Sequence, residues 1–337
     1  LGKFSSARLI LDQLIGDPAT PIQTRDRAEQ LSDQINDVID PTKVRGGFAV
    51  FSGVTGNAYG RSEEDQILFG DTVFNNTTKD ENDDFRGFFA YFAASHELDV
   101  QTPTIFEYGA SVNARDSHNP SLSDTTTLNV NATLKRDGAH KFSTGISAGY
   151  SEVDTRDFSR NVGVFASYTM PIKHFISLSK TISANQTTFY DFPGIARNSD
   201  KSNNSVLAKL EFSRPTPLAL FKLSLSGGRA FAKGDIYDAH HEKAAFSALT
   251  LHRGFSLSTT ISRQWMRYQH ADTFISAERQ KTTTDEASLN VRYAQGFQTK
   301  FIKYVPFIKL LAKDSGSNIP NYRRSNSEIS IGVEGSF

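Results

Sequence analysis

Two groups of residues in this sequence have the types and spacing that enzymes use for hydrolysis. Residues 145–149 (GISAG) match the G-x-S-x-G nucleophile elbow, in which a strand turns sharply into a helix and exposes the serine hydroxyl. No helical pattern follows them, so they indicate a continuing strand. Asp238, His240 and His241 lie in a predicted loop, where an Asp/His pair could activate water. A solvated loop explains these three residues more simply, and the sequence predicts no enzyme.

Metal-ligating patterns are also weak. The chain has no cysteine, and its eight histidines are scattered without an H-E-x-x-H motif. The segment 60–84 is rich in carboxylates, which could hold a divalent cation against lipopolysaccharide phosphate, but it lacks the spacing of an EF-hand loop. A solvated acidic loop is favoured, and we expect neither a metal nor another cofactor. The carboxylates are Glu63, Glu64, Asp65, Asp71, Asp80, Glu81, Asp83 and Asp84.

Composition narrows the class of protein that must position these residues. The 337 residues include 26 Phe and 11 Tyr, and 37 basic side chains balance 37 acidic ones. Without net charge there is no long-range field to attract nucleic acid, so no nucleic-acid partner is expected. The mean hydropathy is -0.41, and no apolar run approaches the ~18 residues of a transmembrane helix. A transmembrane β-barrel passes these tests, because apolar and polar residues alternate along its strands.

The first part of the chain, residues 1–42, has a helical rather than a strand pattern. One short helical stretch ends before residue 16, and a second runs from about 22 to 39. Together they predict a helical hairpin of the tetratricopeptide kind, although an unrelated helical hairpin fits equally well. One hairpin cannot bury its apolar face alone, so either further repeats precede it or it docks on another surface. The docking candidates are Leu11, Leu14, Ala28 and Leu31.

From residue 43 to residue 337 the apolar side chains follow a period of two. In the last segment Ile329, Ile331 and Val333 share one face, while Glu328 and Glu334 lie on the other. Segments of this kind predict an antiparallel barrel of about fourteen strands. The expected strands are 44–58, 85–98, 103–114, 124–135, 140–152, 160–171, 173–184, 204–213, 218–231, 242–252, 255–267, 284–295, 299–313 and 325–337.

Loop lengths distinguish this barrel from a soluble sandwich, whose strands also alternate. Short turns near 98–102, 135–140, 170–173, 214–217, 252–254 and 295–298 alternate with longer polar stretches. The longer stretches are 60–84, 115–123, 153–159, 185–203, 232–241, 268–284 and 314–324. An outer-membrane barrel has this asymmetry, with short periplasmic turns, long extracellular loops and an even number of strands. We therefore expect a monomeric barrel in the outer membrane of a Gram-negative bacterium, with the helical hairpin in the periplasm.

Aromatic residues near strand ends fit interfacial girdles that contact lipid and lipopolysaccharide. The girdle candidates are Tyr59, Phe85, Tyr168, Phe212, Phe231, Tyr268 and Tyr293. The terminal Phe337 has the form of a signal for the barrel-insertion machinery. The charges predicted to face the lumen are Lys209, Glu211, Lys222, Arg292, Glu328 and Glu334. Both signs of charge are present, which suits a hydrated or plugged interior better than an ion-selective pore. The simpler interpretation is that these side chains are only solvated or paired with one another across the lumen.

The last part of the sequence resembles a known family. Residues 261–268 (ISRQWMRY), 271–274 (ADTF), Arg279, 296–297 and 317–324 (SNIPNYRR), ending on Gly332 and Phe337, are similar to the end of the surface lipoprotein assembly modifier (Slam) barrel. In that family a periplasmic tetratricopeptide domain precedes a fourteen-stranded barrel. The resemblance implies export of lipoproteins or small secreted proteins to the cell surface, with these proteins as cargo.

This chain departs from the family in having one readable hairpin where a longer helical array is common, and that departure bears on how cargo is captured. A passive porin or a polysaccharide export channel is the alternative function, and an outer-membrane hydrolase is the third. A row of lumen aromatics beside acidic residues would favour glycans, and the sequence has no clear row.

Overall fold

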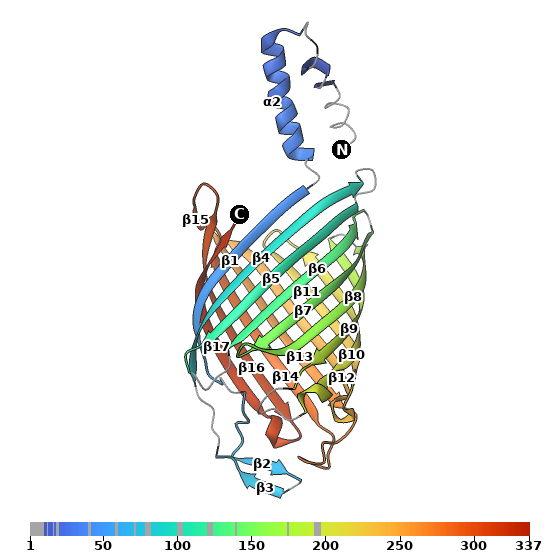
Figure 1. The fold of residues 1–337 in the computed structure, drawn as a ribbon, viewed down its shortest axis with the longest axis vertical. Helices are drawn as coiled ribbons and strands as arrows, with labels where there is room; N and C mark the ends of the chain where they lie inside the picture. The colour runs from blue at the N-terminus through green and yellow to red at the C-terminus, as the bar shows by residue number, and fades with distance from the viewer. Residues whose placement is uncertain are drawn as a thin grey trace.

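The computed structural model describes residues 10–11, 13–15, 17, 20–39, 42–57, 60–70, 72–77, 82–99, 104–119, 124–138, 140–173, 175–191 and 197–337. In these residues the chain forms a helical N-terminal segment followed by one large closed sheet (Figure 1). Of the girdle candidates Tyr59 lies outside the described residues, as do Asp71, Asp80 and Glu81 of the acidic segment.

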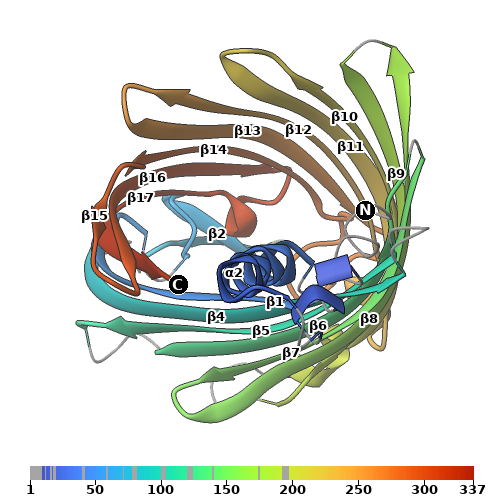
Figure 2. The ribbon, with the colours of Figure 1, turned by 90° about the horizontal axis from the view of Figure 1, so that it is seen from above.

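Fourteen antiparallel strands close into a barrel. They are β1 (Thr42–Thr55), β4 (Asp83–Asp99), β5 (Thr104–Ser117), β6 (Thr125–Arg136), β7 (Lys141–Val153), β8 (Arg156–Lys173), β9 (Ile176–Phe189), β10 (Asn203–Pro215), β11 (Ala219–Ala232), β12 (Ala239–His252), β13 (Phe255–Tyr268), β14 (Lys281–Tyr293), β16 (Lys303–Ser317) and β17 (Arg324–Ser336). Neighbours in this order pair, and β1 pairs with β17, so the sheet closes on itself (Figure 2). The predicted fold is confirmed, and every predicted strand is present with ends that differ by a few residues.

The two faces of each strand differ in chemistry. Residues directly opposite in antiparallel strands share a face. The inward face of each strand can therefore be followed from one paired strand to the next around the whole barrel. Val130, Leu223 and Ile331 lie on the outward face and are exposed. Asn131 and Ser224 follow two of them in sequence and lie on the inward face. The predicted alternation therefore separates an apolar outer surface from a polar lumen.

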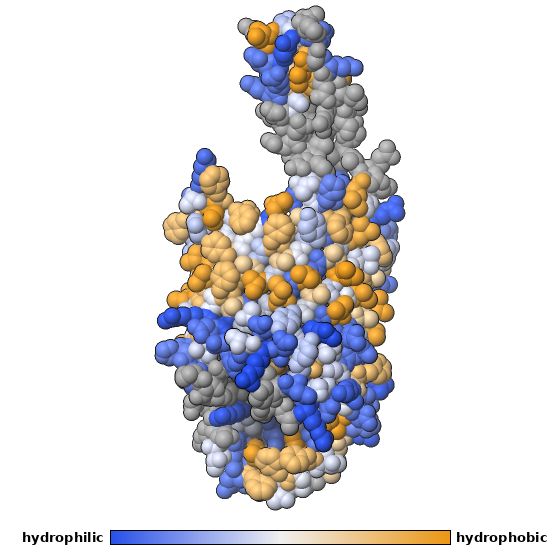
Figure 3. Space-filling view, viewed as in Figure 1, coloured by the Kyte–Doolittle hydropathy of each residue, from blue (hydrophilic) through white to orange (hydrophobic). Residues whose placement is uncertain are grey.

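The apolar outer surface is a band that lies nearer to one end of the barrel, as Figure 3 shows for one side of the molecule. We call the end where β1 begins and β17 ends the terminal end, and the opposite end the loop end. On β13, Phe255 and Ile261 belong to the band, whereas Arg263 follows on the same face toward the loop end and pairs with Asp285 at 2.6 Å. An apolar band bounded by charge is typical of a lipid-exposed barrel. The strands thus continue past the band at the loop end.

Two connections differ from the lengths that the sequence indicated. The predicted long stretch 153–159 is a tight turn, in which Asp154 and Thr155 have φ values of 49° and 61°. Consecutive positive φ values are the signature of a type I′ hairpin turn, which usually contains glycine, and no glycine marks it here. The predicted short turn 295–298 belongs to a longer connection that contains β15 (Phe297–Gln298). Strict alternation of short and long connections is therefore wrong at these two places.

The connection between β1 and β4 carries a small hairpin of its own at the loop end (Figure 1). It consists of β2 (Gln66–Phe69) and β3 (Thr72–Asn75). The Leu68 amide donates to Asn321 Oδ1 at 2.8 Å, and Asn321 Nδ2 donates to the Leu68 carbonyl at 2.9 Å. Asn321 belongs to the 3-10 helix η3 (Pro320–Tyr322) between β16 and β17. The described part of the acidic segment is therefore folded against a neighbouring connection rather than merely solvated.

A helical segment lies beyond the terminal end of the barrel (Figure 1). Residues 10–11 and 13–15 are helical, and α2 spans Ile22–Ile39, as the sequence predicts. Among the described residues, no helix has the length and apolar character needed to cross a bilayer. Because β1 begins at Thr42, the change from helix to strand falls where the sequence changes character.

Candidate transport lumen

One sector of the lumen wall is built mainly from small polar residues. Their hydroxyl groups bond across neighbouring strands, with Oγ–Oγ distances of 2.7 Å between Ser151 and Ser159 and 3.1 Å between Ser167 and Ser179. The inward positions of this sector include Ser143, Gly145, Ser147, Gly149, Asn161, Gly163, Thr181, Ser183 and Asn185, on β7, β8 and β9. Small hydroxyl, amide and glycine residues leave room for water, so this sector presents a hydrated and uncharged surface.

Three of the predicted lumen charges form one cluster on β10 and β11. Glu211 accepts a hydrogen bond from Lys209 Nζ at 2.6 Å, and Lys222 Nζ lies 3.6 Å from the other carboxylate oxygen. Ser224 and Ser226, directly opposite Glu211 and Lys209, continue the inward face. Because two ammonium groups share one carboxylate, the cluster leaves a single positive charge toward the lumen.

The other predicted lumen charges also meet partners. Arg292 lies 3.3 Å from Glu334, and Arg115 lies 2.9 Å from Glu328. The second pair joins β5 to β17, which are separated by β1 and β4 in the sheet. Its arginine was not among the residues predicted from the sequence. All six predicted charges therefore lie in ion pairs, while their role in transport stays a prediction.

Two aromatic residues assigned to the outer girdle face the lumen instead. Phe85 is 1% exposed and contacts Phe51, and the Arg115 guanidinium lies 3.6 Å from the centre of its ring. Tyr268 lines a cavity inside the barrel. The girdle prediction was wrong for both because nearness to a strand end does not fix the face. The period of two assigns Phe88 of β4, not Phe85, to the outer surface.

Basic residues on β16 and β12 were missed by the sequence reasoning. Lys303, Lys309 and Lys313 share the inward face of β16, and Lys243 lies on the inward face of β12. In the described part of the chain, none of the four takes part in an ion pair within 4.0 Å. Their alternation with Ile308, Leu310 and other outward residues was the available signal. This wall is cationic, in contrast to the hydroxyl-lined sector.

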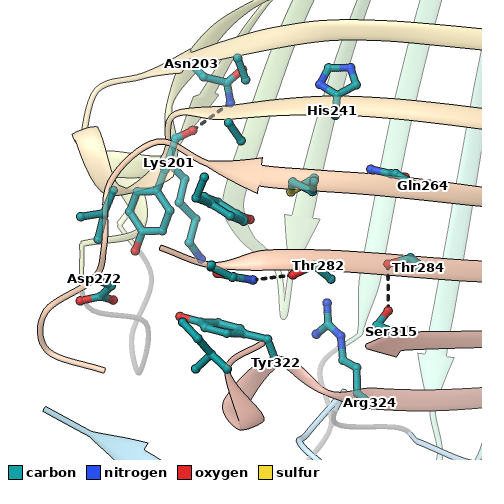
Figure 4. Close-up of a pocket in the computed structure, with 18 of the residues that line it drawn as sticks. Lys201, Asn203, His241, Gln264, Asp272, Thr282, Thr284, Ser315, Tyr322 and Arg324 are labelled. Carbon is teal, nitrogen blue, oxygen red and sulfur yellow. Dashed lines mark hydrogen bonds between the residues drawn. The ribbon is translucent and has the colours of Figure 1, made fainter. Parts of the chain in front are cut away.

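A cavity of about 650 Å³ opens into the lumen at the loop end (Figure 4). Its walls come from β12, β13, β14 and β16, with single residues from β9, β10, β11 and β17, and from four connections, one of which contains the 3-10 helix η2 (Asp235–Tyr237). Lys201, Tyr322 and Arg324 contribute side chains from or beside the connections, while His241 and Gln264 project from the strands. The cavity combines aromatic, apolar and basic side chains at one end of the barrel.

The residues considered for hydrolysis do not assemble a catalytic site. Residues 145–149 lie within β7, with no turn into a helix. His240 and His241 are consecutive residues of β12 rather than loop residues, so their side chains project to opposite faces. Asp238 accepts a hydrogen bond from the Ala232 amide and lies 4.0 Å from Arg229. Among the described residues no group of three or more His, Asp or Glu side chains has the geometry of a metal site.

The four docking candidates in the helical segment divide into two pairs. Leu11 and Ala28 are buried, at 9% and 3% exposed. Leu14 and Leu31 are 36% and 44% exposed, and Ile10 and Ile22 are also exposed. The buried pair stabilises the helical segment, which leaves the exposed residues to form any docking surface.

Comparisons with known proteins give structural likenesses alone. No family model and no curated protein matches the chain. A Pseudomonas aeruginosa FadL homologue has 9% identity and a TM-score of 0.49, over 90% of this chain and 91% of that one. A deltaS2 mutant of the TodX monoaromatic hydrocarbon channel has 7% identity and a TM-score of 0.46, over 87% and 90%. An anion-selective porin from Comamonas acidovorans has 10% identity and a TM-score of 0.41, over 88% and 99%. At these scores the barrel is assigned from its own strand register.

Proposed function

We propose that this protein is an outer-membrane translocon that exports lipoproteins or small secreted proteins to the cell surface. The observation that carries the proposal is apolar surface on the helical segment beyond the terminal end. Ile10, Leu14, Ile22 and Leu31 are between 36% and 73% exposed there. Exposed apolar side chains on a water-facing element are typical of protein-binding surfaces. A passive channel has no need of such a surface at its entrance.

The barrel itself supports passage of a polar substrate. Its closed sheet satisfies the backbone hydrogen bonds in the bilayer, and its lumen is lined by small hydroxyl and amide side chains. In the proposed orientation the terminal end and the helical segment face the periplasm. Cargo would then contact the helical segment first and cross along the hydrated wall of β7 to β9.

The test removes apolar surface without unfolding the helices. We expect Leu14→Asp combined with Leu31→Asp to leave a folded barrel in the outer membrane and to reduce surface display of an exported neighbouring-gene protein at least tenfold. Display is measured by antibody or protease accessibility on intact cells, and barrel folding by heat-modifiable migration on gels.

A matched control places the same charges beside those positions. Gln13 and Gln30 are exposed neighbours of the two leucines, so Gln13→Asp with Gln30→Asp adds two carboxylates without removing apolar area. Display is expected to stay within twofold of the unchanged protein. Equal loss in both double variants would attribute the defect to charge, and unchanged display in the leucine variant would exclude the docking role.

The lysines on β16, which have no ion pair within 4.0 Å among the described residues, favour a second candidate function, a passive channel for small anions. Lys303, Lys309 and Lys313 line one wall from the terminal end to the loop end. A row of uncompensated positive charge lowers the electrostatic barrier for anions. In liposomes containing the purified full chain, steady anion flux that persists in the Leu14→Asp/Leu31→Asp variant would support this function over export.

A further inference from the structure

The cavity at the loop end has the size of a small-molecule site. Its volume of about 650 Å³ lies within the range of about 300–1,000 Å³ that is usual for ligand pockets. It lies beside β13 residues that follow the apolar band, so it occupies the part of the barrel that extends past the bilayer. A ligand there would enter from water and would not cross lipid.

The cavity walls separate an apolar region from a basic region. The apolar region lies near the connections: Ile236 and Tyr322 belong to the 3-10 helices η2 and η3, and Met266 lies two residues before the loop end of β13. Lys243 of β12 and Lys313 of β16 lie deeper in the barrel, on strands that β13 and β14 separate in the sheet. Lys243 is opposite Gln264, whereas Lys313 is opposite Glu286 and thereby level with Ser262, two residues from Gln264 along β13. An amphipathic molecule fits this division, with its apolar body toward the connections and its charged group toward the lysines.

The charge of the cavity favours an anion. Lys201, Lys243, Lys313 and Arg324 line it together with the carboxylates of Asp272 and Glu286, which leaves two positive charges in excess when histidine is neutral. None of these four cations takes part in an ion pair within 4.0 Å in the described part of the chain. The cations that face the lumen on β10, β11 and β14 are, in contrast, paired.

Phenol groups add neutral hydrogen-bond donors to the same cavity. Tyr237, Tyr268 and Tyr322 line it from three different elements. Burial, with the nearby Asp272 carboxylate, raises the pKa of the Tyr322 phenol to about 12, and burial raises the pKa of Tyr237. Both phenols therefore keep their protons at neutral pH. Their rings offer flat surfaces on which an aromatic ring packs favourably.

We propose that this cavity binds a small aromatic monocarboxylate, whose ring packs against Met266 and Tyr322 and whose carboxylate interacts with Lys243 and Lys313. A neutral aromatic compound would leave the lysines uncompensated. Inorganic phosphate would lack an apolar body to pack against the rings of the cavity. This inference goes beyond the proposed export function and does not depend on what crosses the lumen.

The test uses the purified full chain in detergent, with 4-fluorobenzoate as the probe and fluorine NMR line broadening as the readout. We expect saturable binding of 4-fluorobenzoate and at least tenfold weaker binding of the neutral isostere 4-fluorobenzamide. The double variant Lys243→Met/Lys313→Met is expected to weaken benzoate binding at least tenfold while changing benzamide binding less than twofold. Heat-modifiable migration checks that each variant is folded, and the two single variants replace the double variant if it does not fold.

A control removes equal charge from the same end of the barrel. Lys233 and Lys281 are exposed at the loop end and do not line the cavity. Lys233→Met/Lys281→Met is expected to leave benzoate affinity within twofold. Equal affinity for benzoate and benzamide, equal weakening in both double variants, or no saturable binding of benzoate would each overturn the proposal. None of these results bears on cargo display, so the two proposals fail separately.

Discussion

Replacing Val130 by arginine tests whether the outer band faces lipid. On β6 the outward apolar residues run from Leu128 to Leu134, so Val130 lies one residue from the middle of the band. With a rise of ~3.3 Å per residue and a strand tilt of ~40°, it lies about 2–3 Å from the bilayer midplane. Arginine near the midplane of a barrel costs about 2–4 kcal/mol. We expect Val130→Arg to lower the unfolding free energy by that amount.

The neighbouring residue provides the control for the same substitution. Asn131 lies on the inward face, opposite Gly109 and Ser147, so an arginine there enters the hydrated lumen. Asn131→Arg is expected to cost less than about 1 kcal/mol, because its charge stays solvated. The assay is reversible urea unfolding in phosphatidylcholine vesicles, followed by the fluorescence of Trp265, the one tryptophan of the chain. Penalties that agree within about 0.5 kcal/mol would refute the assignment of the two faces.

Three further predictions concern orientation, lumen charge and the inward aromatic cluster. The chain has no native cysteine, so a single introduced cysteine reports its own accessibility. On intact cells, Thr273→Cys at the loop end should react with an impermeant maleimide, and Lys300→Cys at the terminal end should not. Reversed labelling would invert the proposed topology. Glu211→Gln removes the carboxylate that is shared by two lysines. The reversal potential in a potassium chloride gradient across a planar bilayer should therefore shift toward that of chloride. An unchanged potential would contradict access of ions to this cluster. Phe85→Ala should destabilise the barrel by about 3–5 kcal/mol, because the ring is 1% exposed between Phe51 and Arg115; a loss below about 1 kcal/mol in the urea assay would show that this packing contributes little.

The sequence predicts the strands well because each strand has one face in lipid and one in water. The residue types of the apolar Val130 and the polar Asn131 therefore indicate which face each side chain occupies, and the same holds along β17. Face assignments fail where a residue type fits both sides. Phe85 is aromatic like the girdle residues, yet it fills space inside the barrel against Phe51. The turn at 154–155 was missed because positive φ values there occur without glycine.

Which inward charges meet could not be predicted, because pairing depends on the register carried around the closed sheet. Arg115 and Glu328 are 213 residues apart in the chain, and the closure of β1 on β17 brings them to 2.9 Å. Lys209 and Glu211 are an exception, since residues two apart on one strand share a face. The loop-end cavity combines side chains from several strands and connections, so no local pattern in the sequence indicates it.

The distribution of charge gives the lumen two different walls. On β7, β8 and β9 the inward hydroxyls bond to one another and carry no net charge, whereas β16 presents Lys303, Lys309 and Lys313. Lys309 lies at the level of the outer band, between Ile308 and Leu310, and in the described residues it has no ion pair within 4.0 Å. An unpaired charge at that depth is tolerated only where water reaches it. The structure therefore requires a hydrated lumen beside β16, and such a path would connect the basic region of the loop-end cavity to the terminal end.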